Sequence, residues 1–132
     1  MFYPLTAVTL WRSQHHITAP DGGAQSIATI PLDTYTQGGA EAVVAVFALW
    51  GLAQLAMALI MLLACIRYKA IIPLLWLFIF FEYAGRFVVL QYKPIETIST
   101  APGANANIIF PFVALAMLAL SLWPRKAASP TD

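Results

Sequence analysis

Two long apolar segments separated by only four residues are the feature that most limits how this chain can fold. Residues 42–66 contain no charged side chain, and residues 71–92 contain only Glu82 and Arg86. Each segment reaches the roughly 20 residues that an α-helix needs to cross the hydrocarbon core of a bilayer. A helix also satisfies its backbone hydrogen bonds internally, as lipid demands. We therefore predict two transmembrane helices joined as an antiparallel hairpin.

Two shorter apolar segments lie at the ends of the chain. Residues 108–123 would form about 24 Å of helix, which is short for a membrane span. We expect Asn105 or Asn107 to cap its beginning and Pro124 to end it. Residues 1–11 would form only about 16 Å of helix. They are predicted to be a partial helix, either an interfacial helix or the remainder of a first transmembrane helix.

Composition places the whole chain in a membrane as one domain. Only 10% of its residues are charged, against about 25% in soluble domains. The fold class predicted is all-α, a polytopic membrane helix bundle with three full transmembrane helices and a partial N-terminal helix, resembling a four-helix bundle. Residues 12–41 and 93–107 are rich in turn-forming residues and are predicted loops. The bilayer is the expected partner, and the net charge of +1 argues against nucleic acid.

The basic residues near the span ends predict an orientation, because Lys and Arg are retained on the cytoplasmic side. Four lie on the side of the tight turn and the C-terminus, and two lie on the side of the long loops: Arg67, Lys69, Arg125 and Lys126 against Arg12 and Lys93. We therefore expect residues 124–132 to be a cytoplasmic tail and both long loops to lie outside.

A weak internal repeat connects the two long loops. Thr18, Ala19, Pro20 and Ala24 recur at a constant offset as Thr100, Ala101, Pro102 and Ala106. If the repeat is genuine, the chain consists of two helix-loop-helix hairpins in a parallel arrangement. Such a short match in common small residues also arises by chance.

The charged residues inside the second long segment are the leading candidate site. Glu82 and Arg86 are four residues apart, so they share one helix face and can pair. Gln54 would lie at a similar depth on the neighbouring helix and is expected to donate a hydrogen bond to Glu82. Ala84 and Gly85 would let a neighbouring helix approach closely. This polar cluster either binds a proton, cation or polar solute, or only fastens helices together.

The loop residues offer a weaker alternative. His15 and His16 are adjacent, and Asp21 and Asp33 could supply oxygen ligands, but adjacent side chains diverge and nothing in the pattern fixes them around a metal. We expect no metal and no cofactor. The single cysteine, Cys65, cannot form an internal disulfide and is interpreted as a small apolar residue near a helix end.

Three functions are compatible with this pattern. The first is a structural or accessory membrane protein that acts by helix packing, as a homo-oligomer or with a partner membrane subunit. The second is a small transporter or channel-like protein in which Gln54, Glu82 and Arg86 line the path. The third, a membrane enzyme using His15 and His16, is the least favoured because no nucleophile and base spacing is recognisable.

Four sequence strings resemble an uncharacterised group of small bacterial membrane proteins whose architecture is similar to that of DoxX-like four-helix proteins. They are residues 20–33 (PDGGAQSIATIPLD), 47–54 (FALWGLAQ), 82–86 (EYAGR) and 93–97 (KPIET). The resemblance covers nearly the whole chain and implies a four-helix bundle in a bacterial inner membrane. It implies no activity and no catalytic residue. The chain departs from that pattern in its short first helix.

Overall fold

The computed structural model describes residues 2–123, which form four α-helices and no strand. The helices are α1 (Phe2–Thr18), α2 (Gln37–Ile66), α3 (Ile72–Tyr92) and α4 (Ala104–Leu122), with short 3₁₀ turns at Leu32–Thr34 and Lys69–Ile71. By length and apolar composition, α2, α3 with its preceding turn, and α4 can each cross a bilayer. The predicted all-α fold with three spans is confirmed, and the chain is an integral membrane protein. The predicted tail, residues 124–132, lies outside the described residues.

Helix α1 is longer than the sequence prediction, which ended it at residue 11. It continues to Thr18 and therefore includes Arg12, His15 and His16, which the prediction placed in a loop. The prediction ended the helix at the first charge, but a charge ends an apolar run and does not break a helix. The turn-forming residues that do stop a helix begin only at Pro20.

Helices α2 and α4 also begin earlier than predicted. Helix α2 starts at Gln37, where the Thr36 hydroxyl accepts a hydrogen bond from the backbone N–H of Gly39 at 3.2 Å. Such an N-cap satisfies one of the free donors at a helix start. Helix α4 starts after Gly103 and has no side-chain cap, so the predicted capping by Asn105 or Asn107 is wrong.

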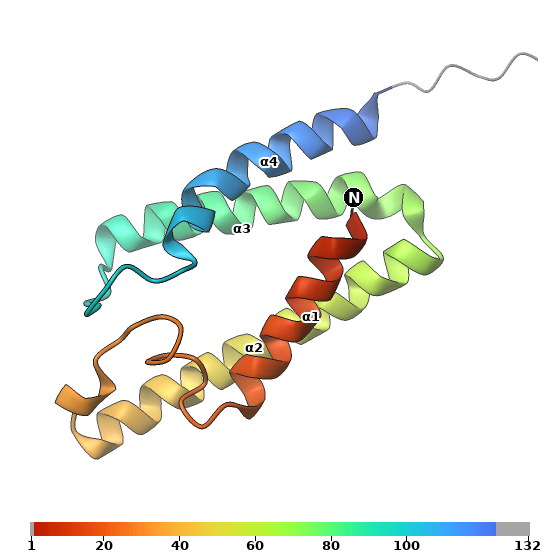
Figure 1. Cartoon of the computed structure of the whole chain (residues 1–132). Coiled ribbons are helices and arrows are strands. Elements are labelled where there is room, and N and C mark those ends of the chain that lie inside the picture. Colours follow the sequence, from red (N-terminus) through yellow and green to blue (C-terminus); the bar gives the residue numbers. More distant parts are fainter. Residues whose placement is uncertain (1, 124–132) are drawn as a thin grey trace, which may run out of the picture.

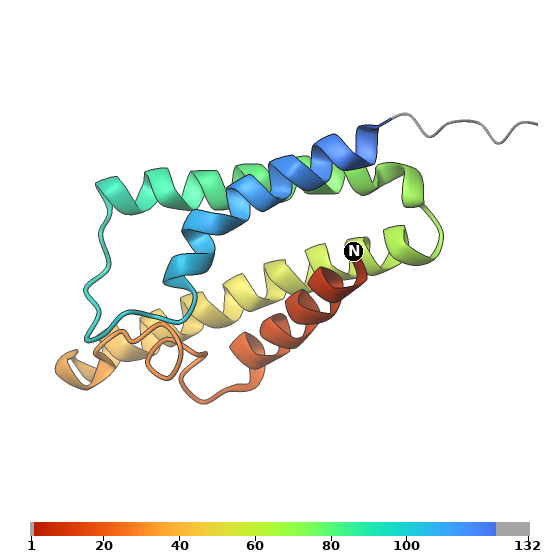
Figure 2. The same cartoon turned by 45° about the horizontal axis from the view of Figure 1, so that its top comes forward.

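The four helices pack as two pairs. Helix α1 lies along α2 and α3 along α4, whereas α2 and α3 have few contacts with each other beyond their connection. Figures 1 and 2 show the two pairs diverging from the α2–α3 turn toward the end that carries the long loops. The predicted α2–α3 hairpin is therefore connected but not closely packed. The observed pairing is the one that the internal repeat implies.

A glycine allows α1 to pack closely on α2. A Cβ atom at Gly51 would lie 2.6 Å from His16 Cβ and 3.1 Å from the Ser13 carbonyl oxygen, so no side chain fits between these two helices. Small residues let membrane helices approach in this way. The sequence favoured Gly85 for this role, but a Cβ atom placed at Gly85 would have no neighbouring atom within 4 Å. Gly85 is therefore not at a close approach between helices.

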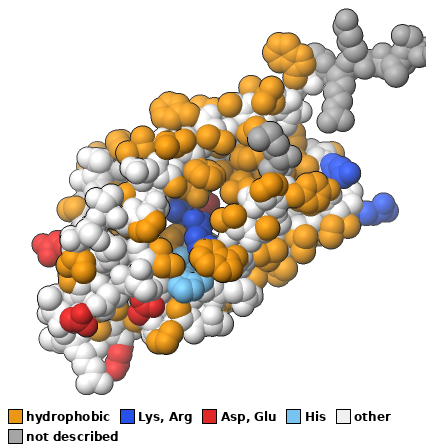
Figure 3. Space-filling model, viewed as in Figure 1, with side chains coloured by type: hydrophobic (Ala, Val, Ile, Leu, Met, Phe, Trp, Pro, Cys, Tyr) orange, Lys and Arg blue, Asp and Glu red, His pale blue; other side chains and the backbone are white. Residues whose placement is uncertain are grey.

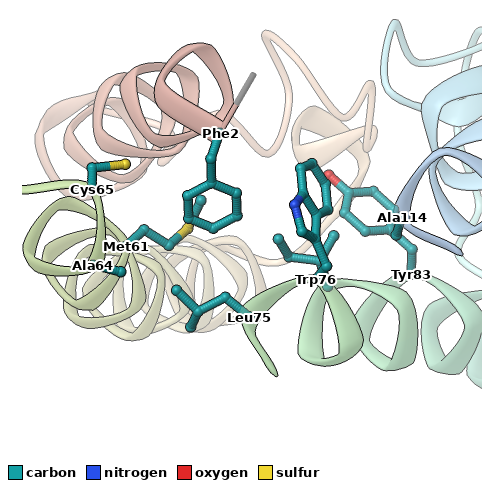
Figure 4. Packing of buried hydrophobic residues seen from close by; sticks show 9 residues of the cluster. Phe2, Met61, Ala64, Cys65, Leu75, Trp76, Tyr83 and Ala114 are labelled. Carbon is teal, nitrogen blue, oxygen red and sulfur yellow. The ribbon is translucent and has the colours of Figure 1, made fainter. Parts of the chain in front are cut away.

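The main hydrophobic core lies near the α2–α3 turn, where all four helices contribute side chains (Figure 4). The Phe2 ring packs edge-on against Trp76 with centroids 5.2 Å apart, which joins α1 to α3. Cys65 is buried beside them, as the sequence predicts for a small apolar residue. This core holds the two pairs together at one end only.

The two long loops close the other end by contacting each other. The Thr29 carbonyl oxygen accepts a hydrogen bond from the Ile98 backbone N–H at 3.0 Å, and the Thr29 hydroxyl donates to the Ser99 carbonyl oxygen at 2.7 Å. Thr29 has a φ of 58°, a left-handed conformation that a threonine rarely adopts. The space between the diverging pairs is therefore covered by both loops.

Candidate functional site

A cavity of about 780 Å³ lies between the two helix pairs at the loop end. We call it the loop-side cavity. All four helices and both long loops contribute to its wall, which is mainly apolar. Figure 3 shows basic side chains in a hollow flanked by hydrophobic side chains, with a histidine at its edge. The polar groups of the wall include Arg12, His16, Arg86 and Asn107.

Arg12 projects from α1 across the gap between the pairs. Its Nε donates a hydrogen bond to Gln54 Oε1 on α2 at 2.8 Å, and its Nη1 lies 3.5 Å from the Tyr83 hydroxyl on α3. Gln54 therefore accepts from Arg12, and the predicted hydrogen bond from Gln54 to Glu82 is absent. The reason is the longer α1, which brings an arginine beside Gln54 that the sequence prediction had assigned to a loop.

Arg86 reaches the same cavity from α3. It pairs with Glu82 one turn earlier, as predicted from their spacing. Its guanidinium carbon lies 4.9 Å from the centre of the Trp50 ring and 4.8 Å from that of Tyr83. Both distances are within the range of cation–π contacts. The ion pair and the two rings hold the arginine at the cavity wall.

The charges at this cavity do not cancel. Within residues 2–123, the Glu82–Arg86 pair is the only ion pair. The partners of Arg12 are an amide and a phenol, which are both neutral. Since arginine stays protonated in proteins, the site carries one positive charge in excess in mainly apolar surroundings.

His16 forms the loop-side edge of this site. Its Nδ1 lies 2.6 Å from the Gly22 carbonyl oxygen, so Nδ1 carries the proton of this hydrogen bond. Burial lowers the pKa of His16, the Gly22 carbonyl raises it, and nearby Arg12 lowers it further; the net direction is downward. Gly22 and Gly23 both have positive φ, which allows the chain to fold back over this ring.

A second cavity of about 410 Å³ lies deeper along the bundle, between α1, α2 and α3. We call it the mid-bundle cavity. Its wall is also mainly apolar and includes Met57, Met61 and Ile79, together with the polar side chains of Gln54 and Glu82. Two of the three predicted site residues thus lie at the mid-bundle cavity, and Arg86 lies at the loop-side cavity.

The predicted loop residues do not come together as a metal site. Residues 2–123 contain no group of three or more His, Cys, Asp or Glu side chains able to hold a metal ion. His15 stacks on Trp11 with centroids 5.8 Å apart, and its buried Nε2 has no hydrogen-bond partner. Asp33 accepts a hydrogen bond from Gln25.

Asp21 organises the first long loop. Its carboxylate accepts hydrogen bonds from the backbone N–H groups of Gly23, Gln25 and Ser26 at 2.7 to 3.1 Å. Burial alone would raise the pKa of Asp21, but these hydrogen bonds outweigh burial and lower the pKa to about 2. The role of Asp21 is to fix the backbone that covers His16.

Three residues of this site were missed by the sequence prediction. Arg12 was counted as a loop charge, while Trp50 and Tyr83 were not singled out. A continuous helix through Arg12 would have placed this residue beside the bundle and not in a loop. The contact between Trp50 and both arginines depends on how the two pairs meet, which no local pattern reveals.

These features define a class: a polytopic α-helical membrane protein with a positively charged, mainly apolar cavity between two helix hairpins. No family model, curated protein or solved structure matches the chain.

Proposed function

We propose that the protein binds an amphiphilic organic anion in the loop-side cavity, with a phosphate or carboxylate group between Arg12 and Arg86. The observation that carries this proposal is the convergence of two arginines from different helix pairs on one mainly apolar cavity. Arginine suits phosphate and carboxylate groups because its planar guanidinium donates paired hydrogen bonds to them. The apolar remainder of the wall suits a hydrocarbon portion of the same ligand.

The unbalanced charge of Arg12 favours ligand binding over a purely structural role. A cluster that only fastens helices needs neutralisation within the protein, because an uncompensated charge in a membrane domain is costly. An anion would supply the missing partner of Arg12. The alternative of an accessory protein that acts by helix packing, alone or as an oligomer, is favoured by the hydrogen bond from Arg12 toward Tyr83, which joins the two pairs.

We further propose that both long loops face the extracytoplasmic side and that the C-terminus is cytoplasmic. The longer α1 supports this orientation, because Arg12 belongs to the bundle wall and no longer counts as a loop charge. Lys93 then remains as the basic residue of the loop side, against Arg67 and Lys69 at the turn and two more after α4. A bacterial inner membrane as the location rests on the sequence resemblance alone.

The test is binding of matched probes by the full chain in phosphatidylcholine nanodiscs. Octyl phosphate and octyl glucoside have the same alkyl chain, and only the first is an anion. We expect calorimetry to detect saturable binding of octyl phosphate alone. Arg12→Gln or Arg86→Gln should weaken it roughly ten- to a hundredfold, because a hydrogen bond to a charged group contributes about 1.5 to 3 kcal/mol.

The control is Arg67→Gln, which removes an arginine that lines neither cavity. This variant should bind octyl phosphate as the unmodified protein does, and circular dichroism should show equal helix content in all variants. Equal binding of both probes, or unchanged affinity in the Arg12 and Arg86 variants, would contradict the proposal.

A further inference from the structure

The two cavities share part of their walls. Arg12, Trp50 and Tyr83 line both the loop-side and the mid-bundle cavity, so these three side chains form the partition between them. The partition joins side chains of α1, α2 and α3. Together the two cavities extend from the loops to the level of Met61, near the hydrophobic core.

Arg12 contacts the other two side chains of the partition only weakly. Arg12 and Tyr83 approach only to 3.5 Å, at the limit of a hydrogen bond. The Arg12 guanidinium carbon lies 5.9 Å from the Trp50 ring centre, at the outer limit of a cation–π contact. The boundary between Arg12 and the two rings is therefore the weakest part of the partition, and it is there that we expect a ligand to pass.

The mid-bundle cavity has the chemistry of a site for a lipid chain and its ester linkage. Its apolar wall matches hydrocarbon, and Gln54 supplies a polar group close to the partition. Gln54 is 94% buried, because its exposed fraction is 6%, and its Nε2 has no acceptor within residues 2–123. A buried amide donor without a partner costs free energy, and an ester carbonyl oxygen would satisfy it.

Several side chains that line the mid-bundle cavity are exposed, so the cavity is not closed on all sides. Phe78 is 49% exposed and the Glu82 side chain is 42% exposed, and both line the cavity from α3. Ala53 lines it from α2 and is also exposed. Since α2 and α3 are long and apolar enough to span a membrane, an opening of the cavity beside these exposed residues would face the hydrocarbon region. An acyl chain in this cavity would therefore have a lateral route to the bilayer.

We infer that the bound anion is a membrane glycerolipid with a monoanionic phosphodiester headgroup, such as phosphatidylglycerol. The inference rests on the proposed function and narrows its ligand from any amphiphilic anion to a lipid. The phosphate occupies the loop-side cavity, where the one unpaired arginine matches a single negative charge. The ester carbonyl accepts from Gln54, and the acyl chain passes the partition into the mid-bundle cavity.

The experiment locates the acyl chain by photochemical cross-linking. The full chain is placed in phosphatidylcholine nanodiscs that contain phosphatidylglycerol with a diazirine on one acyl chain, and labelled peptides are identified by mass spectrometry. We expect labels on Met57, Met61 or Ile79. The matched photoreactive phosphatidylcholine should leave these residues unlabelled, because its headgroup carries a cation that the arginines repel.

Two neighbouring substitutions on α2 provide the second arm. Ala53→Trp fills the mouth of the mid-bundle cavity and should abolish its labelling. Leu52→Trp places the same indole on a residue that lines neither cavity and should leave labelling unchanged. Labelling of the mid-bundle residues that persists in Ala53→Trp, or labels confined to lipid-facing residues such as Leu49, would overturn the inference.

Octyl phosphate binding separates this inference from the proposed function. If octyl phosphate binds through Arg12 while photoreactive phosphatidylglycerol does not label the mid-bundle cavity, the inference of a lipid ligand fails. The proposed anion site is then still supported. If neither probe occupies the cavities, both proposals fail. If phosphatidylglycerol and phosphatidylcholine label the mid-bundle residues equally, the inference of an anionic lipid is overturned, because acyl chains would then enter the cavity whatever their headgroup.

Discussion

Replacing Gly51 by alanine should separate α1 from α2. A Cβ at this position would lie 2.6 Å from His16 Cβ, whereas nonbonded carbon atoms prefer about 3.5 to 4.0 Å. Helix α1 would therefore have to move by about 1 Å, since the opposing atoms are a Cβ and the Ser13 backbone carbonyl oxygen, which side-chain rotation cannot displace. Overpacking of this kind typically costs about 1 to 3 kcal/mol.

Gly85→Ala is the matched control. Both glycines lie within membrane-spanning helices, so both substitutions bring the same gain in helix propensity, up to about 1 kcal/mol. No atom lies within 4 Å of a Cβ placed at Gly85. The difference in unfolding free energy between the two variants therefore isolates the overpacking at Gly51, and we expect it to be about 1 to 3 kcal/mol.

The assay is denaturant-induced unfolding of both variants in the same detergent, followed by circular dichroism. Octyl phosphate affinity should fall with Gly51→Ala as well, because Arg12 and His16 lie on the displaced helix. Equal unfolding free energies for the two variants would refute the close packing of α1 on α2. Unaltered octyl phosphate binding in a destabilised Gly51→Ala would refute the role of α1 in the site.

Three further perturbations probe the loop, the ion pair and the partition. Asp21→Asn should lower the melting temperature at pH 7. The folded-state pKa of Asp21 is lowered to about 2 from 3.8. The stability that its carboxylate contributes is therefore complete above the unfolded-state pKa and is lost as the pH falls through the folded-state pKa. The difference in melting temperature from the unmodified protein should shrink below about pH 4 and vanish below about pH 2. Glu82→Gln releases Arg86 and should tighten octyl phosphate binding in calorimetry; weaker binding would argue against an anion site. Tyr83→Phe loses only the long contact with Arg12 and should change the unfolding free energy by no more than about 0.5 kcal/mol.

The membrane-spanning fold could be predicted from the sequence because its causes are local. The long apolar segments at residues 42–66 and 71–92, the second interrupted by Glu82 and Arg86, require helices in lipid, whatever the helices pack against. The ends of the helices were predicted less well, since an apolar run stops at a charge but a helix stops at turn-forming residues. Helix α1 therefore continues through His15 and His16 to Thr18.

The sequence predicted only those contacts of the candidate site that form within a single helix. Glu82 and Arg86 pair because they are four residues apart on α3, and this spacing is visible in the sequence. Arg12 was overlooked because its contact with Gln54 joins residues 42 positions apart. Such a contact depends on which helices pack together, and the α2–α3 connection suggested the wrong pair.

By itself, the sequence determined that the chain is helical, that it enters a membrane, and that Glu82 and Arg86 share a helix face, because hydrophobic length and helical spacing are properties of single segments. The tertiary structure alone decided that α1 packs on α2 and α3 on α4. The absence of a side chain at Gly51 permits the first of these pairings. The gap between the two pairs then becomes a cavity lined by two arginines.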